Sequence, residues 1–114
     1  MKVWKLSREF RKDIYQISQK FPKQEQYTLT SQIRRAAISI TANIAEGHGR
    51  YHYQEEIHCL RIARGSLNEV LDHLYAALDH KYINQEVFDR LYKNGREIER
   101  TLNGYIGYLQ KKKD

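Results

Sequence analysis

The segment from Ser31 to Arg50, SQIRRAAISITANIAEGHGR, constrains the fold more than any other part of the chain. At 100° per residue, one stripe of a single helix collects the apolar residues Ile33, Ala37, Ile40 and Ile44. A second apolar stripe lies roughly opposite and holds the residues Ile38, Ala42 and Ala45. Such a helix packs one face inside a bundle and offers the other for a second contact. We expect Gly47 to end it as a left-handed cap.

Three further segments repeat this helical spacing of apolar residues, and the predicted helices span about 6–20, 29–46, 53–81 and 85–110. Pro22 ends the first helix, because the residue before a proline avoids the helical region. Thr28 or Thr30 is expected to cap the second helix and Asn84 the fourth. Val3 and Trp4 are expected to precede the first helix and fold over the bundle end.

The connections between these helices are short, which favours antiparallel neighbours. A chain of 114 residues is long enough for one core and too short for two. The sequence therefore predicts an all-α, antiparallel up-down-up-down four-helix bundle that forms one domain over residues 1–114.

Charge and composition narrow the classes of function. The net charge of +6, from 20 Lys and Arg against 14 Asp and Glu, favours polyanionic partners, although many soluble basic proteins bind no nucleic acid. No apolar run approaches the ~20 residues of a membrane span, so we expect no membrane association. The lone Cys59 excludes an internal disulfide and suits a reducing cytoplasm.

Side chains suited to catalysis or metal binding do not converge in the sequence. His73 and His80 are seven residues apart on one predicted helix, roughly 10.5 Å of rise, and cannot share one ion. Cys59 is not at a helix N-terminus, where its pKa would be lowered. The GHGR turn lacks the preceding strand and the lysine of a phosphate-binding loop. We predict no enzyme, no metal and no cofactor.

Arginines are the candidate nucleic-acid contacts. Five are expected to cluster about the second and third helices, with few acids nearby and with tyrosines and a histidine at residues 51–53 alongside: Arg34, Arg35, Arg50, Arg61 and Arg64. Arginine beside aromatic rings suits a surface that grips phosphates and stacks on bases. Arg96 and Arg100 on the fourth helix are further candidates, although interleaved acids there are typical of a solvated face.

The outward sides of the second and third helices carry small and apolar residues where charge is expected. These candidate oligomer contacts are Ile38, Ala42, Ala45, Ile62, Gly65 and Ala76. A glycine inside a helix costs about 1 kcal/mol relative to alanine, and we interpret Gly65 as permitting close backbone approach. The hypothesis is self-association.

Several stretches resemble the 23S rRNA intervening-sequence protein family, with the similarity extending from about Lys2 to Leu109. They are KVWKLSREF, FPKQEQYTLTSQIRRAAISI, ANIAEGHGR and LRIARGSLNEV. The resemblance implies an antiparallel four-helix bundle that assembles as a ring-like homo-oligomer, a pentamer. A related group, the accessory variability proteins of diversity-generating retroelements, binds nucleic acid and engages a reverse transcriptase. By similarity, the partners of this chain are other copies of itself, RNA or DNA, or a reverse transcriptase.

The chain departs from the family pattern near the start of the third helix. Glu56 and Cys59 stand where aromatic residues are frequent, His52 where Ser or Thr caps the helix, and Thr41 replaces a frequent proline. We expect a looser core there and an altered turn surface.

Three functions remain open from the sequence. The first is a nucleic-acid-binding homo-oligomer, and the second is a scaffold or accessory factor for a protein such as a reverse transcriptase. The third, a metal-dependent nuclease, would need Glu46 or His48 as an essential residue.

Overall fold

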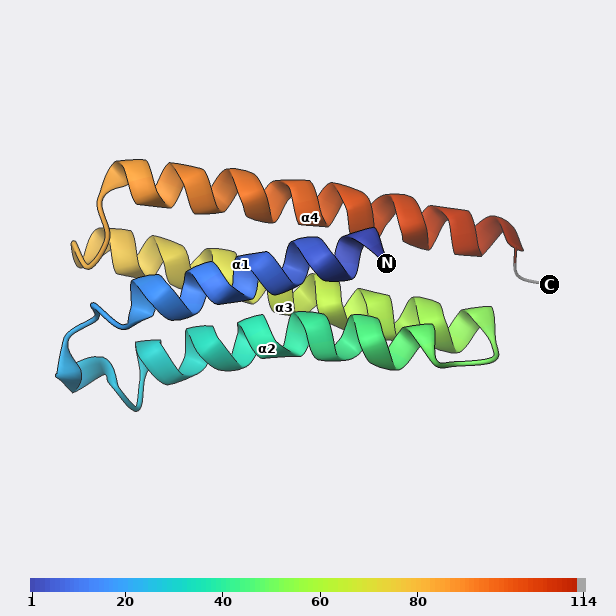
Figure 1. The fold of residues 1–114 in the computed structure, drawn as a ribbon, viewed down its shortest axis with the longest axis horizontal. Helices are drawn as coiled ribbons and strands as arrows, with labels where there is room; N and C mark the ends of the chain where they lie inside the picture. Colours follow the sequence, from blue (N-terminus) through green and yellow to red (C-terminus); the bar gives the residue numbers. More distant parts are fainter. Residues whose placement is uncertain (113–114) are drawn as a thin grey trace.

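A computed structural model describes residues 1–112 as four long helices, α1 (Lys2–Ser18), α2 (Leu29–His48), α3 (Tyr53–Asp79) and α4 (Gln85–Lys112). A short 3-10 helix, η1 (Lys23–Glu25), lies between α1 and α2. Successive helices run antiparallel and pack against one another, and α4 returns to α1 (Figure 1). The bundle measures 49 × 25 × 18 Å. The predicted all-α antiparallel four-helix bundle is confirmed.

The core is one apolar cluster to which all four helices contribute. Its largest fully buried side chains include Phe10, Ile14, Ile33, Ile40, Ile44, Leu60, Leu67, Leu74, Leu91, Ile98 and Leu102. These residues recur three or four apart within each helix, so that one stripe of every helix faces inward. Near the end of α3, Ala77 is buried and Leu78 is only partly buried.

The start of α1 differs from the expectation. The helix begins at Lys2, so Val3 and Trp4 lie inside it and do not fold over the bundle end from a preceding segment. Val3 is buried, and the Ser7 hydroxyl donates to its carbonyl oxygen over 2.8 Å. Because Val3 lies seven residues before Phe10, it extends the apolar stripe of α1 by two turns.

The predicted left-handed cap at Gly47 is wrong. Gly47 is buried inside α2, and no glycine in the described residues has a positive φ. A Cβ atom at Gly47 would lie 2.9 Å from Cβ of Cys59, so the absence of a side chain at Gly47 permits the close approach of α2 and α3. The left-handed residue is Lys81 (φ 63°), after α3, where Tyr82 N–H donates to the Ala77 carbonyl over 2.8 Å as in a Schellman motif.

The two predicted helix caps have different outcomes. Asn84 caps α4 as expected, since its Oδ1 atom accepts from the backbone N–H of Val87 over 2.8 Å. Thr28 occupies the cap position of α2, but its side chain makes no capping hydrogen bond and donates to the Glu25 carboxylate instead. Glu25 also accepts from the N–H of Leu29 over 3.4 Å, so the acid three residues earlier caps α2.

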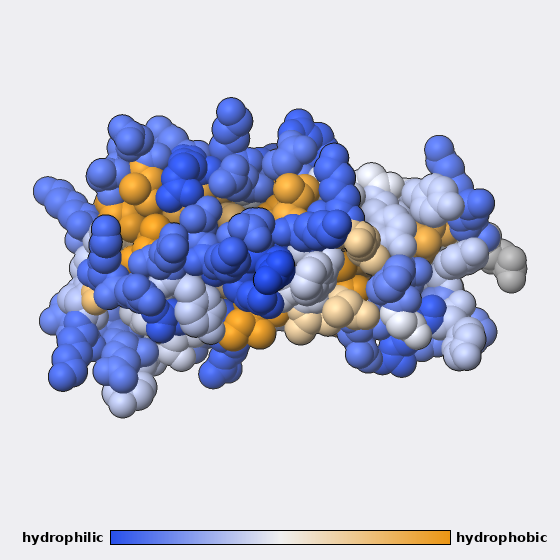
Figure 2. Space-filling model, viewed as in Figure 1, coloured by the Kyte–Doolittle hydropathy of each residue, from blue (hydrophilic) through white to orange (hydrophobic). Residues whose placement is uncertain are grey.

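The surface is largely hydrophilic, with separate apolar areas between α1 and α4 and over α2 (Figure 2). Across residues 1–112, no helix is both long enough and apolar enough to cross a membrane.

Candidate nucleic-acid interface

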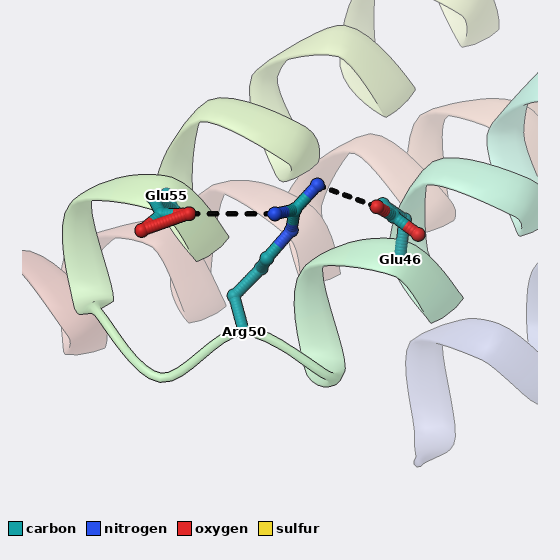
Figure 3. A network of polar contacts seen from close by, with 3 residues as sticks. All are labelled: Glu46, Arg50 and Glu55. Atoms are coloured by element: carbon teal, nitrogen blue, oxygen red, sulfur yellow. Dashed lines mark hydrogen bonds and ion pairs between the residues drawn. The ribbon is translucent and has the colours of Figure 1, made fainter.

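Arg50 is neutralised within the chain. Its guanidinium group lies between two carboxylates, 2.5 Å from Glu46 and 3.5 Å from Glu55, where the turn after α2 leads into α3 (Figure 3). The sequence interpretation that few acids lie near Arg50 is therefore wrong. An arginine shared by two carboxylates offers less charge to a phosphate than one without an acidic partner.

The two candidates on α4 are also paired. Arg96 lies 2.7 Å from the Glu99 carboxylate, and Arg100 pairs with Glu97. Both arginines are exposed, and each of their partners lies three residues away on the same helix. The interleaved acids thus form the solvated face that was the alternative interpretation of this pattern.

The α3 arginines lie apart from those at the start of α2. Arg64 donates to the side-chain oxygen of Asn103 on α4 over 2.7 Å, and Arg61 is exposed with no ion pair among the described residues. The hydroxyl groups of Ser39 and Ser66 lie 2.8 Å apart and mark the register between antiparallel α2 and α3. In that register Arg35 and Arg61 lie in opposite directions from the contact, separated by roughly 13 Å of helix rise. The predicted five-arginine cluster therefore does not form.

Arg34 and Arg35 do come together in a groove that we call the Arg34–Arg35 groove. It has a volume of about 500 Å³ and is lined by Tyr15, Gln26, Tyr27, Thr30, Ser31, Arg34, Arg35 and Ile38. These residues come from α1, from the segment after η1 and from α2. The lining holds two cations, two phenol rings and two hydroxyls, and none of these lining residues is acidic.

Arg34 is held in place from α1. Its Nε atom donates to the Ser18 hydroxyl over 2.8 Å, a terminal nitrogen donates to the Tyr15 carbonyl over 3.3 Å, and its guanidinium carbon lies 4.7 Å from the centre of the Tyr15 ring. A guanidinium group has five N–H donors, so three remain for a ligand. Because the side chain is already ordered, binding a phosphate there costs less conformational entropy.

A second arginine crosses the same seam between α1 and α2. Arg11 donates to the Thr41 hydroxyl over 2.8 Å, and Thr41 itself donates to the Ile38 carbonyl. Thr41 is buried and accepts this cross-helix hydrogen bond with its hydroxyl oxygen.

Glu25 fixes the wall of the groove that carries Gln26 and Tyr27. Its carboxylate accepts from the Thr28 hydroxyl over 2.5 Å and from the Tyr82 hydroxyl over 2.8 Å, which ties this segment to the turn between α3 and α4. The hydrogen bond from Thr28 is the main cause of a lowered pKa of Glu25, and the hydrogen bond from Tyr82 is the next. The hydrogen bond to Glu25 raises the pKa of Tyr82.

Sequence reasoning missed the aromatic members of the groove, Tyr15 and Tyr27. Tyr15 lies off the apolar stripe of α1, and Tyr27 lies in a polar loop, where a tyrosine carries no pattern of its own. The tyrosines of residues 51–53, which were expected beside the arginines, line no part of this groove.

The candidate oligomer contacts are at the surface as predicted, except that Ala76 is partly buried. Ile38 and Ile62 are 44% and 42% exposed, and Ala42, Ala45 and Gly65 are also exposed. A Cβ atom at Gly65 would have no neighbour within 4 Å in this chain, so Gly65 permits no close approach between helices of the bundle. The close approaches are at Gly47 and at Gly95, where an added Cβ would lie 2.7 Å from Leu71.

No three His, Cys, Asp or Glu side chains in residues 1–112 gather into a group able to hold a metal ion. Glu46, one of the two residues considered for a nuclease, is the ion-pair partner of Arg50.

Residues 1–104 match the model of a protein family described as 23S rRNA-intervening sequence protein. The fold is similar to the crystal structure of a protein of unknown function from the S23 ribosomal protein family of Bacteroides thetaiotaomicron, with a TM-score of 0.85 and 28% sequence identity. The superposition covers 91% of this chain and 97% of the other. No curated protein matches the sequence.

Proposed function

The chain belongs to the 23S rRNA-intervening sequence protein family, and on that premise we propose that it is a non-enzymatic, basic homo-oligomer that binds nucleic acid. The observation that carries this proposal is the Arg34–Arg35 groove, in which two arginines and two tyrosines meet without an acidic lining residue. Phosphate contacts from arginine supply most of the affinity of such surfaces, and aromatic rings add stacking.

The proposed contacts are those candidate arginines that the chain does not neutralise. Arg34 and Arg35 line the groove, and Arg61 is exposed on α3 without an ion pair in the described residues. Arg64 keeps donors free beyond its single hydrogen bond to Asn103. Arg50, Arg96 and Arg100 contribute chiefly to the net charge, since each has an acidic partner.

Self-association would multiply the charge of +6 per subunit. We propose that Ile38, Ala42, Ala45 and Ile62 contact a second copy, because these small or apolar side chains are exposed on the outer faces of α2 and α3. A ring, by kinship a pentamer, would repeat the groove around its circumference. A cytoplasmic protein with such a surface would meet RNA and DNA directly.

The binding test compares two variants with the same loss of charge. Arg34, Arg35 and Arg61 are changed to alanine in one, and Arg50, Arg96 and Arg100 in the other. In an electrophoretic shift assay with mixed RNA and DNA, we expect the first variant to lose most of its binding and the second to keep most of it. Equal losses would mean that net charge alone drives binding, and circular dichroism checks that both variants fold.

The assembly test uses light scattering at micromolar concentration. The wild type should be an oligomer, and Ala42→Lys with Ile62→Lys should dissociate it, because two charges then enter an apolar contact. The control Asn94→Lys, an exposed position on α4, should leave the oligomer intact. A monomeric wild type would contradict self-association.

The exposed apolar residues also suit a different protein partner, so a scaffold for a polymerase such as a reverse transcriptase is the second candidate function. A pull-down that recovers one protein partner after nuclease treatment, with a wild type that binds no nucleic acid, would favour the scaffold.

A further inference from the structure

We propose that the Arg34–Arg35 groove takes an unpaired nucleotide, so that single-stranded nucleic acid is the preferred ligand of this protein. This inference rests on the proposed function and names the form of nucleic acid that the site selects. It comes from the arrangement of two arginines, one exposed ring and short polar side chains around a single hollow.

The phosphate position is set by Arg34. The hydrogen bonds from Arg34 to Ser18 and Tyr15 fix its guanidinium plane over the Tyr15 ring and leave three N–H donors free. Arg35 lies beside it in the groove, exposed and without an ion pair in the described part of the chain. Two arginines that line one groove, one of them held by hydrogen bonds from α1, suit the oxygens of a phosphodiester.

The base position is set by Tyr27. Its side chain is 84% exposed, although a phenol ring of this size is ordinarily part of a core or an interface. Tyr27 lines the same groove as both arginines, so a base stacked on it lies next to its own phosphate. Stacking needs a free π-face and tolerates any base, which fits a ring in an open position.

Short polar side chains complete the groove. The Gln26 amide and the Thr30 and Ser31 hydroxyls supply donors and acceptors that can reach a base edge or a 2′-hydroxyl group. Glu25 holds the segment that carries Gln26 and Tyr27 through its hydrogen bond with Tyr82, so this wall is anchored before a ligand arrives.

A duplex cannot use the whole groove. In a duplex the bases are paired and stacked inside, so its phosphates can meet Arg34 and Arg35 while Tyr27 finds no base face without unpairing. A single strand engages the arginines and the ring together. The groove volume of about 500 Å³ is on the scale of one nucleotide and far below that of a duplex turn.

The test measures fluorescence anisotropy with a labelled single-stranded oligonucleotide of about 10 nucleotides and with the duplex of the same sequence. We expect the full-length wild type to bind the single strand more tightly. Tyr27→Ala should weaken single-strand binding by roughly 5- to 150-fold, the range for loss of one stacked base, and should leave duplex binding unchanged. Tyr27→Phe should retain single-strand binding, because it keeps the ring.

Two controls separate the contribution of the Tyr27 ring to binding from effects of folding and of net charge. Tyr51→Ala removes a ring that is 98% exposed and outside the groove, and it should change neither affinity. Heparin, a polyanion without bases, should bind wild type and Tyr27→Ala alike.

The outcomes separate the two proposals. Equal or tighter duplex binding, or a Tyr27→Ala variant with unchanged single-strand affinity, would overturn the single-strand assignment while the nucleic-acid function stands. A wild type that binds neither nucleic acid at low salt would overturn both.

Discussion

The Tyr105 hydroxyl on α4 donates to the Glu56 carboxylate on α3 over 2.8 Å. Glu56 is only 7% exposed, which is rare for a carboxylate, and it lies in the first turns of α3, where the positive end of the helix dipole favours a negative charge. Burial first, and the hydrogen bond to Glu56 second, raise the pKa of Tyr105 to about 12. Glu56, at a position where the family resemblance leads us to expect an aromatic residue, is thus stabilised by the Tyr105 hydroxyl from α4.

Tyr105→Phe should destabilise the protein by about 1–3 kcal/mol, because it leaves the buried Glu56 carboxylate without its phenol donor. Chemical denaturation at pH 7 measures this change. The control Tyr108→Phe alters a ring that is 55% exposed and should change stability by less than about 0.5 kcal/mol.

The same contact predicts a pH dependence. The folded pKa of Tyr105 is raised to about 12 from the ordinary value near 10, so its contribution is complete below pH ~10 and is lost as the pH rises toward 12. Phenolate absorbance should show one late-titrating tyrosine fewer in Tyr105→Phe than in the wild type. A wild type and variant with identical alkaline titrations would rule out the contact.

Glu25→Gln should destabilise the start of α2 at neutral pH, because the carboxylate accepts from Thr28, Leu29 and Tyr82. The folded pKa of Glu25 is lowered, so its contribution is present above the unfolded value of about 4.3 and is lost as the pH falls through the folded value. Thermal unfolding of both proteins should differ at pH 7 and converge in acid. A difference that persists unchanged in acid would argue against this account.

Gly47→Ala should destabilise the bundle by about 1–3 kcal/mol. The new Cβ atom would lie 2.9 Å from Cβ of Cys59 and 3.2 Å from the Glu56 carbonyl oxygen, and neither atom is the end of a flexible side chain. Gly104→Ala is the matched control, since a Cβ there meets nothing within 4 Å; it should stabilise α4 by about 0.5–1 kcal/mol. Opposite signs for the two variants in urea unfolding are the expected result.

Lys81→Gly should stabilise the protein by up to about 1 kcal/mol. Lys81 has φ 63°, a conformation that glycine adopts without steric cost and lysine does not. The urea midpoint should rise. A clear fall in the midpoint would mean that the Lys81 side chain stabilises the turn more than its backbone conformation costs.

The number and approximate bounds of these helices follow from the sequence because apolar spacing at three and four residues specifies which side of each helix is buried. The Asn84 cap is equally local and could be predicted. The role of Gly47 could not, since its reason is the opposing Cβ of Cys59, twelve residues along the chain on another helix. From the sequence alone, a glycine beside a turn is interpreted as a helix cap, because the position of the neighbouring helix is not known.

The candidate site could likewise be predicted only where its residues are close together in the sequence. Arg34 and Arg35 are adjacent in sequence, and their charge is visible there. Tyr15 and Tyr27 reach them only because η1 returns the chain from α1 to α2. The ion pairs of Arg50 depend on the turn, which brings the Glu55 carboxylate within 3.5 Å, and on Glu46, which lies one helical turn earlier on α2.

The salt dependence of nucleic-acid binding tests the central claim most directly. If unpaired arginines bind phosphates, the logarithm of the association constant should fall linearly with the logarithm of salt concentration for the wild type. Changing Arg34, Arg35 and Arg61 to alanine should make the slope shallower by about 0.7 for each lost contact with a single strand. Binding that is absent at low salt, or that does not change with salt, would contradict the claim.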